Sequence, residues 1–428
     1  MEIIKYPARN TWAHIVERPH LDARMLGETV SDMLADIRCR GDEAVREYVR
    51  RFQGAEIGAL EVSPEEMAEA EAAVSSELKE AIAVAGENIS RFHASQTMET
   101  RKVETTPGVI CWQKAVPIER VGLYIPGGTA PLFSTVLMLA VPARVAGCRE
   151  IVLCTPCAAD GKVHPAVLYA ARVAGVHRIY KLGGVQAIGA MAYGTESVPS
   201  VYKIFGPGNQ YVTEAKQQVT RHGVAIDMPA GPSEVAVIAD ASSDMAFVAS
   251  DFLSQAEHGA DSQSILFTTD ESVIEPLLAE IDHQLSVLSR RELTEKSLSH
   301  SRVVLLRDKQ ELIDLANLYA PEHLIIQCAD YLDIADRVVN AGSVFLGPYT
   351  PESAGDYASG TNHTLPTSGY ARAYSGVNLD SFIRKITFQE ITRDGLLRLG
   401  PVIEVMAANE GLDAHKNAVS VRLDKEIK

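Results

Sequence analysis

The sequence predicts an α/β protein with two tandem doubly wound, Rossmann-like domains, a helical N-terminal region and an extended C-terminal helical tail. First, apolar runs of strand type alternate with helical runs from Arg120 to Leu346. Second, the connections between these runs are short, which is typical of a parallel sheet with helices on both faces. Third, a break rich in proline and glycine at residues 229–232 divides the alternating region into two similar series.

The composition argues against several classes of partner. The chain has 428 residues and a formal net charge of −16, so neither nucleic acid nor an anionic membrane is expected as a partner. No apolar run is long enough to span a bilayer, and the first residues lack a signal-peptide pattern. Six scattered cysteines are typical of a reducing compartment, so we expect a cytoplasmic protein. Cys154 and Cys157 lie close together, but a zinc ribbon needs a second pair, and a redox role is not favoured.

The N-terminal third is expected to be mainly helical. Residues 1–20 are interpreted as an irregular arm with a short helix, and helical spacing of apolar residues runs from Leu21 to about Phe92. Ser63 before Pro64 predicts a capped helix start. Residues 103–115 alternate enough for a hairpin that turns at Pro107 and Gly108.

The two alternating series follow. The first has expected strands at 121–124, 151–154, 178–181, 202–205 and 224–226, with helices at 132–146, 164–174, 185–193 and 209–220. The second has strands at 234–239, 264–268, 303–306, 324–327 and 343–346, with helices at 244–257, 272–287, 309–318 and 330–340.

The last part of the chain is expected to hold a functional loop and a tail. Residues 347–376 are rich in Gly, Ser, Thr, Pro and Tyr without periodicity, and irregular loops of this length are often functional. Residues 379–428 are predicted to be helical around Phe382, Ile386 and Phe388, and to end in a strand at 418–423.

Gln255 and His258 are the first candidate for a metal site. They lie three residues apart at the end of an expected helix that Gly259 would stop, so both face the same side. Nitrogen and oxygen donors without thiolate suit zinc or another first-row divalent ion. Taken alone, the pair favours a simpler interpretation, in which Gln255 is solvated and His258 caps the helix end.

Three glycine-rich turns could bind an anion. Each precedes an expected helix, whose first N–H groups and dipole favour a group such as pyrophosphate. None of them is a G-x-G-x-x-G motif, and no acidic residue stands at the expected distance to hold a ribose, so tight structural turns explain them equally well. The turns are Ile125–Thr129, Leu182–Gln186 and Phe205–Asn209.

Glu322 and His323 place a carboxylate and an imidazole side by side just before a strand, which suits two successive proton transfers. A helix-end glutamate beside a partly buried histidine is the open alternative. Taken singly, each later acidic residue or histidine favours an ordinary surface position; these are Asp356, His363, Glu410 and His415. No Gly-x-Ser-x-Gly elbow, P-loop or His-Glu-x-x-His motif is present.

Six motifs in order, from about residue 20 to the end, resemble the histidinol dehydrogenase family. They are Gly122–Gly128, Ile204–Asn209, Asp227–Glu234, Ser254–Gly259, Ala320–Leu324 and Glu410–His415. The resemblance implies a zinc-dependent, NAD-linked oxidoreductase acting on CH–OH, of the type EC 1.1.1.23. It implies oxidation of L-histidinol to L-histidinaldehyde and then to L-histidine, with two NAD+, in histidine biosynthesis.

The resemblance also implies residue roles. Zinc, one ion per subunit, would be held by Gln255, His258, Asp356 and His415. Glu322 and His323 would be the acid–base residues. The substrate would be contacted by Ser233, His363 and Glu410, together with His323 and the zinc-holding residues, and NAD by Tyr124, Gln186 and Asn209.

The family further implies a homodimer in which the tail crosses to the partner, so that Glu410 and His415 complete the neighbouring site. The implied domains are an arm of residues 1–20, an α/β domain of 21–120 and 233–375 with the metal and catalytic residues, an NAD-side domain of 121–232, and a tail of 376–428. Three alternatives stay open: a related zinc and NAD alcohol dehydrogenase acting on another amino- or sulfo-alcohol, a metal-free dehydrogenase, and a non-catalytic zinc-stabilised dimer.

Overall fold

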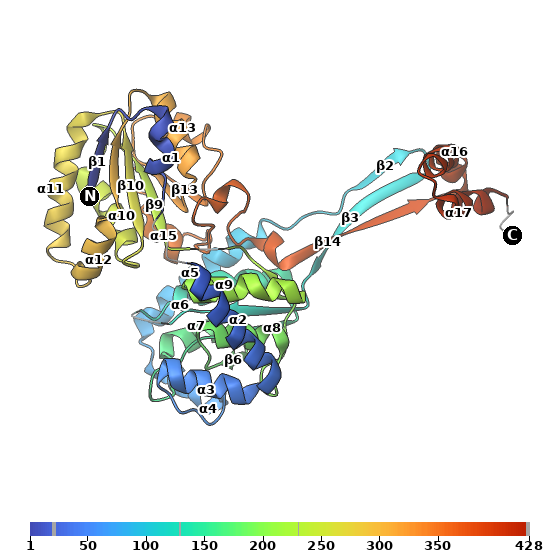
Figure 1. Cartoon of the computed structure of the whole chain (residues 1–428), viewed down its shortest axis with the longest axis horizontal. Helices are drawn as coiled ribbons and strands as arrows, with labels where there is room; N and C mark the ends of the chain where they lie inside the picture. Colours follow the sequence, from blue (N-terminus) through green and yellow to red (C-terminus); the bar gives the residue numbers. More distant parts are fainter. Residues whose placement is uncertain (19–22, 128–129, 230, 425–428) are drawn as a thin grey trace. The chain divides into compact units, whose positions relative to one another are not determined.

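The computed structural model of the chain describes residues 1–18, 23–127, 130–229 and 231–424 (Figure 1). The expectations that involve Leu21, Gly128, Thr129 and Ala230 lie outside the described residues. The chain divides into two units. Unit 1 comprises Met1–Gln96 and Ile118–Phe382, and unit 2 comprises Thr97–Pro117 and Ile383–Lys428.

Unit 1 contains a six-stranded sheet in which every neighbouring pair of strands is parallel. Its order is β1 (Glu2–Lys5), β11 (Arg302–Leu305), β10 (Gln263–Thr268), β9 (Glu234–Ile238), β12 (His323–Ile326) and β13 (Ser343–Leu346). Alternate residues enter different core clusters, Val235 and Val237 in one and Ala236 and Ile238 in the other. One cluster includes α10 (Met245–Ala256), α11 (Ile274–Leu285) and α12 (Arg291–Leu298), and the other α1 (Trp12–Ile15), α13 (Lys309–Tyr319) and α14 (Tyr331–Ala335).

A second parallel sheet of unit 1 has five strands. Its order is β6 (Arg178–Tyr180), β5 (Glu150–Cys154), β4 (Arg120–Tyr124), β7 (Lys203–Phe205) and β8 (Ala225–Ile226). Its core cluster includes α6 (Phe133–Ala146), α7 (Pro165–Ala174), α8 (Gly184–Tyr193) and α9 (Gln210–Val219). The predicted doubly wound α/β class, with two parallel sheets, is therefore confirmed.

The N-terminal helices pack with this second sheet. They are α2 (Ala23–Arg40), α3 (Asp42–Gln53), α4 (Pro64–Ala73) and α5 (Ser76–Ala94), and Val30, Val49 and Ile89 belong to the same core cluster as Leu123 of β4. The sequence-based division grouped residues 21–120 with 233–375 instead. The predicted start at Ser63 is confirmed, because Ser63 and Glu66 form a reciprocal capping box.

Two expectations for unit 1 were wrong in detail. Residues 1–20 are not only an arm with a short helix, because β1 adds an edge strand to the six-stranded sheet. Four residues are too few to reveal a period-two pattern. The segment 347–376 is not wholly irregular, because α15 (Glu352–Tyr357) and a 3₁₀ turn at Tyr370–Arg372 lie within it. Further 3₁₀ turns are Arg9–Thr11, Thr220–His222, Glu271–Val273 and Leu379–Phe382.

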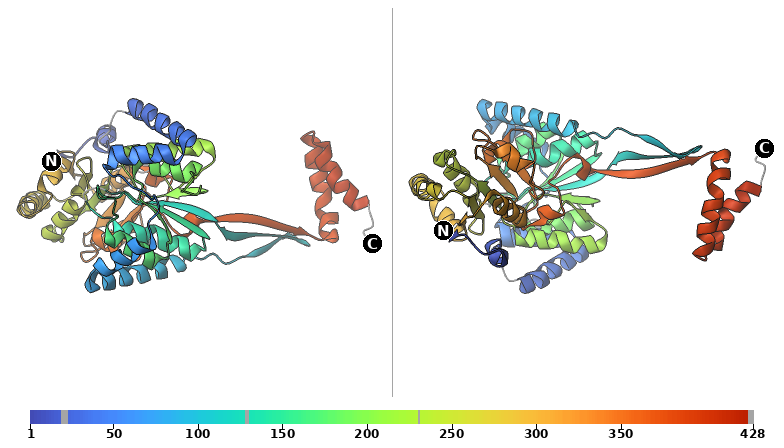
Figure 2. Two further views of the ribbon diagram at one scale, coloured as in Figure 1. Left: turned by 90° about the horizontal axis from the view of Figure 1, so that it is seen from below. Right: turned by 90° about the horizontal axis from the view of Figure 1, so that it is seen from above.

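Unit 2 is an antiparallel three-stranded sheet followed by two helices (Figure 2). The sheet order is β14 (Ile383–Ile391), β3 (Val109–Pro117) and β2 (Lys102–Thr106), and the helices are α16 (Arg393–Asn409) and α17 (Asp413–Asp424). The predicted hairpin is β2 and β3. Trp112 and Phe388 stack across the strands with ring centroids 5.4 Å apart.

The predicted secondary structure of the tail needs correction at both ends. Ile386 and Phe388 lie in β14, because its residues pair with all nine residues of β3. The expected strand at 418–423 is helical, because it packs as part of α17 against α16. A Cβ at Gly400 would lie 3.0 Å from Leu423 and 3.1 Å from Val419, so the missing side chain lets the helices approach closely. Among the described helices, none is long and apolar enough to cross a membrane.

Candidate active site

Functional side chains gather at the amino edge of the six-stranded sheet. Ser233 directly precedes β9, while His323 opens β12, and these two strands are neighbours in the sheet. Gln255 lies in the last turn of α10, beside the start of β9. The glycine turns of the other sheet, by contrast, follow the carboxyl ends of their strands.

His323 is surrounded by buried carboxylates. Its Nδ1 lies 3.7 Å from Oε2 of Glu322 and 3.8 Å from Oε1 of Glu352, and its Nε2 lies 3.5 Å from Oδ1 of Asp356. Neither Nε2 of His323 nor Oδ1 of Asp356 has a hydrogen-bond partner among the described residues. Buried polar atoms rarely remain unpaired, so this pair fits a site that a cation or a polar ligand completes.

The same contacts set the protonation of the group. Burial works to lower the pKa of His323, but Glu352, Glu322 and Asp356 outweigh it and raise that pKa to about 10. Burial raises the pKa of Glu322 and that of Glu352 to about 8. Burial also works to raise the pKa of Asp356, but its contact with His323 outweighs this effect and lowers it. The site therefore combines a histidine and two carboxyl groups whose pKa is raised with one aspartate whose pKa is lowered, and such perturbed groups are typical of functional sites.

Metal donors meet at the same place. One ligand atom each from His258, Glu352 and Asp356 lie within 4.8 Å of one another. Gln255 is buried beside them, and its amide is best satisfied with the nitrogen donating to the Glu352 carboxylate and the oxygen accepting from the Glu234 N–H at 3.0 Å. Imidazole nitrogen with carboxylate and amide oxygens fits zinc, so the residues present fit the metal that the resemblance implies.

Glu352 was missed from the sequence. Its side chain is 1% exposed, and it contacts both His323 and Gln255. The available signal was its spacing from Asp356, since residues four apart lie on one side of a helix. That signal was hidden because residues 347–376 were expected to be irregular.

The predicted substrate residues have different surroundings. Ser233 is half-buried before β9. His363 accepts or donates a hydrogen bond with Oγ1 of Thr135 at 3.0 Å, and its Nδ1 lies 2.8 Å from the backbone oxygen of Asp356. Burial lowers the pKa of His363, so its ring favours the neutral form.

Glu410 and His415 belong to unit 2. Glu410 caps the end of α16, His415 lies in the first turn of α17, and both side chains are exposed. The donor cluster found within unit 1 does not include them.

The three residues expected to contact the cofactor line one cavity of about 1280 Å³ in unit 1. Tyr124 accepts a hydrogen bond from the Gly184 N–H at 3.0 Å, and burial raises its pKa to about 12. Asn209 caps α9 by accepting from two backbone N–H groups. Gln186 lines the cavity beside Gln53, which accepts from the Gly183 N–H at 2.7 Å and which the sequence did not reveal. The cavity is large enough for a dinucleotide.

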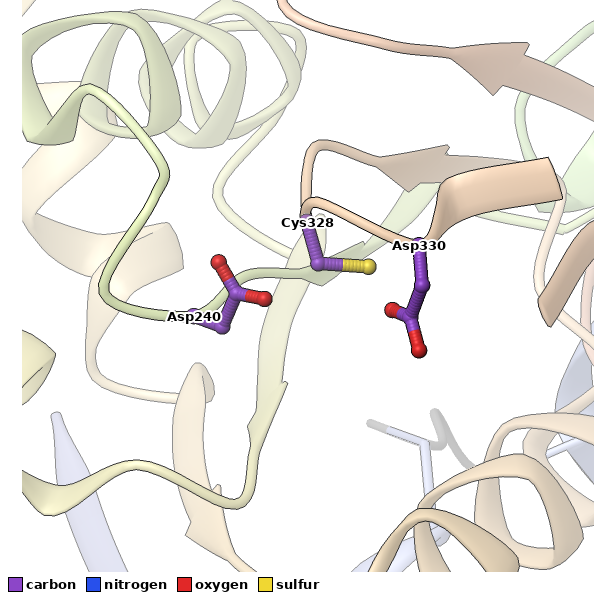
Figure 3. Close-up of side chains that lie close together, drawn as sticks. All are labelled: Asp240, Cys328 and Asp330. Carbon is purple, nitrogen blue, oxygen red and sulfur yellow. The ribbon is translucent and has the colours of Figure 1, made fainter. Parts of the chain in front are cut away.

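Asp240, Cys328 and Asp330 form a second group of potential donors (Figure 3). Lys309 already forms an ion pair with Asp330 and contacts Asp333 at 3.2 Å. The exposed Lys309 ammonium therefore already balances part of the negative charge of this group. Burial raises the pKa of the Cys328 thiol to about 12, which keeps it protonated. The close pair of cysteines is also unsuited to redox chemistry, since both Cys154 and Cys157 are buried free thiols whose pKa is raised by burial.

Buried proton-transfer groups, a nitrogen and oxygen donor cluster and a dinucleotide-sized cavity in one α/β unit are the features of a metal-dependent dehydrogenase. The sequence model described as "Histidinol dehydrogenase" matches residues 16–423. The chain belongs to the histidinol dehydrogenase family, the enzymes of the final steps of histidine biosynthesis.

Individual members of this family are similar to the chain over almost its whole length. The chain is 62% identical to histidinol dehydrogenase of Bacteroides thetaiotaomicron over 99% of both chains. It is 51% identical to histidinol dehydrogenase of Salmonella typhimurium, over 96% of this chain and 94% of that one. The crystal structure of histidinol dehydrogenase from Elizabethkingia anophelis is similar with a TM-score of 0.97 and 53% identity, covering 99% of this chain and 98% of that chain.

Proposed function

We propose that this site oxidises L-histidinol to L-histidine through L-histidinaldehyde, with zinc as the metal and two NAD+ as hydride acceptors. The observation that carries the proposal is His323, buried against Glu322 and facing the unpaired oxygen of Asp356 beside His258. A proton acceptor is thereby adjacent to donors for a metal that can orient an amino alcohol.

The metal would be held by Gln255, His258 and Asp356 together with the partner subunit's His415. Zinc, when bound, supplies a template for the imidazole and the amine of histidinol and favours neutral His323 by its charge. Ser233 and His363, with the partner subunit's Glu410, would contact the substrate. An acidic group suits its amine.

The proton transfers follow from the order of the two oxidations. In the first, neutral His323 accepts the hydroxyl proton while a hydride leaves the adjacent carbon. In the second, Glu322 accepts one proton from the water that adds to the aldehyde, and the hydrate gives a hydride to the second NAD+. The carboxylic acid so formed releases its remaining hydroxyl proton to solvent and becomes the carboxylate. The raised pKa of Glu322 makes its carboxylate basic enough for this step. Tyr124, Gln186 and Asn209 would contact the cofactor in its cavity.

A homodimer is part of the proposal. Helix α16 of unit 2 exposes Val402, Val405 and Met406 at 53%, 63% and 60%. A contiguous apolar face of this kind is usually buried in an interface. We propose that the partner is a second copy, whose unit 2 supplies Glu410 and His415. The cytoplasm stays the expected location, because six free cysteines are typical of a reducing compartment.

The test is NADH formation from L-histidinol, with and without a chelator. We expect two NADH per L-histidinol and loss of activity with the chelator. One NADH per substrate, or activity that resists complete metal removal, would contradict the proposal. A panel of amino- and sulfo-alcohols tests the main alternative, which predicts that another alcohol gives a higher kcat/KM.

A further inference from the structure

Unit 1 contains a buried ion pair beside the glycine turn that precedes α9. Nζ of Lys216, on α9, is 2.5 Å from Oδ1 of Asp227, which follows β8, and their side chains are 4% and 1% exposed. Burying two charges costs desolvation free energy that their attraction often does not repay. The role of this ion pair is therefore inferred from its hydrogen bonds and not from a contribution to the free energy of folding.

Both backbone groups of Gly206 are bonded to the pair. The Gly206 N–H donates to Oδ2 of Asp227 at 2.8 Å, and the Gly206 carbonyl accepts from Nζ of Lys216 at 2.7 Å. Oδ1 of Asp227 also accepts from the Met228 N–H at 2.7 Å. Charge-assisted bonds without competing water hold this residue from two sides.

The position of Gly206 affects the cavity. Its φ is +126°, and a Cβ at this position would collide with the backbone oxygen of Tyr124 at the end of β4. Asn209, three residues later, caps the start of α9 and lines the cofactor cavity with Tyr124. A shift of the turn at 206–209 would thus move Asn209, which lines the cavity, and would change the contact of Gly206 with Tyr124.

We propose that Lys216 and Asp227 are positioning residues, which hold the Gly206–Asn209 turn in the geometry that NAD+ binding requires. Neither of them lines the cavity, so they act through the turn. The inference rests on the proposed NAD+ site. The buried ion pair would then influence the affinity for the cofactor, although it is distant from the metal donors in the sequence and lies beside the other sheet.

The decisive variant is Lys216→Met combined with Asp227→Asn. Removing both charges leaves neither member of the pair as an unpaired ion, and the neighbouring Lys203, whose charge Asp227 favours and Lys216 disfavours, keeps its hydrogen bond to the Ser381 carbonyl at 2.8 Å. An amide oxygen at 227 can still accept from the Gly206 N–H. The donor to the Gly206 carbonyl is lost. We expect a melting temperature, a zinc content and a KM for L-histidinol close to those of the unchanged protein. The KM and Kd for NAD+ should rise about 3- to 10-fold, the size of one hydrogen bond.

A second pair of substitutions tests rescue. Lys216→Gln with Asp227→Asn restores a neutral donor, so its KM for NAD+ should lie closer to that of the unchanged protein. This variant also serves if the methionine variant does not fold. The matched control is Lys309→Met with Asp330→Asn, which removes the same two charges from an exposed ion pair beside the other sheet. It should leave the KM for NAD+ unchanged.

An unchanged KM for NAD+ in the first double variant would overturn the inference, as would equal increases in the KM for both substrates. These outcomes leave the proposed function intact if the unchanged protein still forms two NADH per L-histidinol. Failure of the unchanged protein to do so would contradict the proposed function itself.

Discussion

Glu322 and His323 are adjacent in sequence but have different neighbours. Oε2 of Glu322 lies 3.0 Å from the Glu234 nitrogen and shares its N–H with the Gln255 amide oxygen. The His323 ring instead lies beside Glu322, Glu352 and Asp356. The two side chains can therefore serve different proton transfers.

Glu322→Gln tests that separation of roles. The amide keeps an acceptor for the Glu234 N–H but cannot take a proton from water. We expect the oxidation of L-histidinaldehyde to slow by about 10²-fold or more, and the oxidation of L-histidinol to the aldehyde to be less affected. Single-turnover NADH formation from each compound measures the two halves. Equal losses in both halves would count against the assignment.

His258→Asn tests the donor cluster. The substitution removes an imidazole nitrogen from the group formed with Glu352 and Asp356. We expect the purified variant to retain less than about one tenth of the zinc bound by the unchanged protein, because one metal ligand is missing. Metal analysis of the dialysed protein gives the result. One equivalent of retained zinc would show that the ligand assignment is wrong. His283→Asn, at an exposed histidine on α11, is the matched control.

Some residues of the site could be predicted from the sequence and others could not. Gln255 and His258 were visible as a pair because they lie three residues apart, although only Gln255 lies in α10 and His258 follows the end of that helix. Glu352 and Gln53 were not, because each acts through a contact with a residue distant in the chain, to Gln255 and Gly183 respectively. The roles of His415 and Glu410 came from the resemblance alone, since both side chains are exposed in one chain.

At the scale of elements, helices α10 and α15 meet at buried Asp251. Its Oδ2 accepts from Gln327 at 2.6 Å, and its Oδ1 lies 3.4 Å from the Glu352 nitrogen. Burial raises the pKa of Asp251 from 3.8 to about 6. The folded state therefore favours the protonated acid. The stability that this preference contributes is complete below pH 3.8 and is lost as the pH rises through about 6.

Asp251→Asn should remove that loss. The amide is uncharged at every pH, and its oxygen can still accept from Nε2 of Gln327. We expect the variant to gain about 1–3 kcal/mol relative to the unchanged protein at pH 7.5, and much less at pH 4. Melting temperatures across this range provide the measurement. A difference independent of pH would contradict the explanation.

Secondary structure was predicted correctly where burial gives the sequence a clear hydrophobic pattern. Apart from β1, the strands of both parallel sheets are continuous apolar runs between helices. The presence of each of these strands and its alternation with helices could therefore be predicted. The prediction failed at β1 and β14, which are held by pairing with distant strands, and at the C-terminal helix, which is stabilised by packing against α16 at Gly400. Tertiary contacts decided these elements.

At the scale of the molecule, unit 1 uses opposite edges of its two sheets. The residues proposed to transfer protons and bind the metal lie at the amino ends of β9 and β12, and the cavity proposed for the cofactor lies at the carboxyl ends of β4 to β7. The rule that ligands bind beyond carboxyl ends predicts only the second of these. The parallel class was predictable from sequence, but the choice of edge was not.

The central claim is that one metal site needs residues of two copies of the chain. A direct measurement is the activity of dimers assembled from equal amounts of His258→Asn and His415→Asn subunits, after unfolding and refolding together. In a mixed dimer with shared sites, one site combines both substitutions and the other has neither. Random pairing then restores about a quarter of the normal activity, with matching zinc, although each variant alone is inactive. Activity and zinc content that stay at the level of the separate variants would contradict the account.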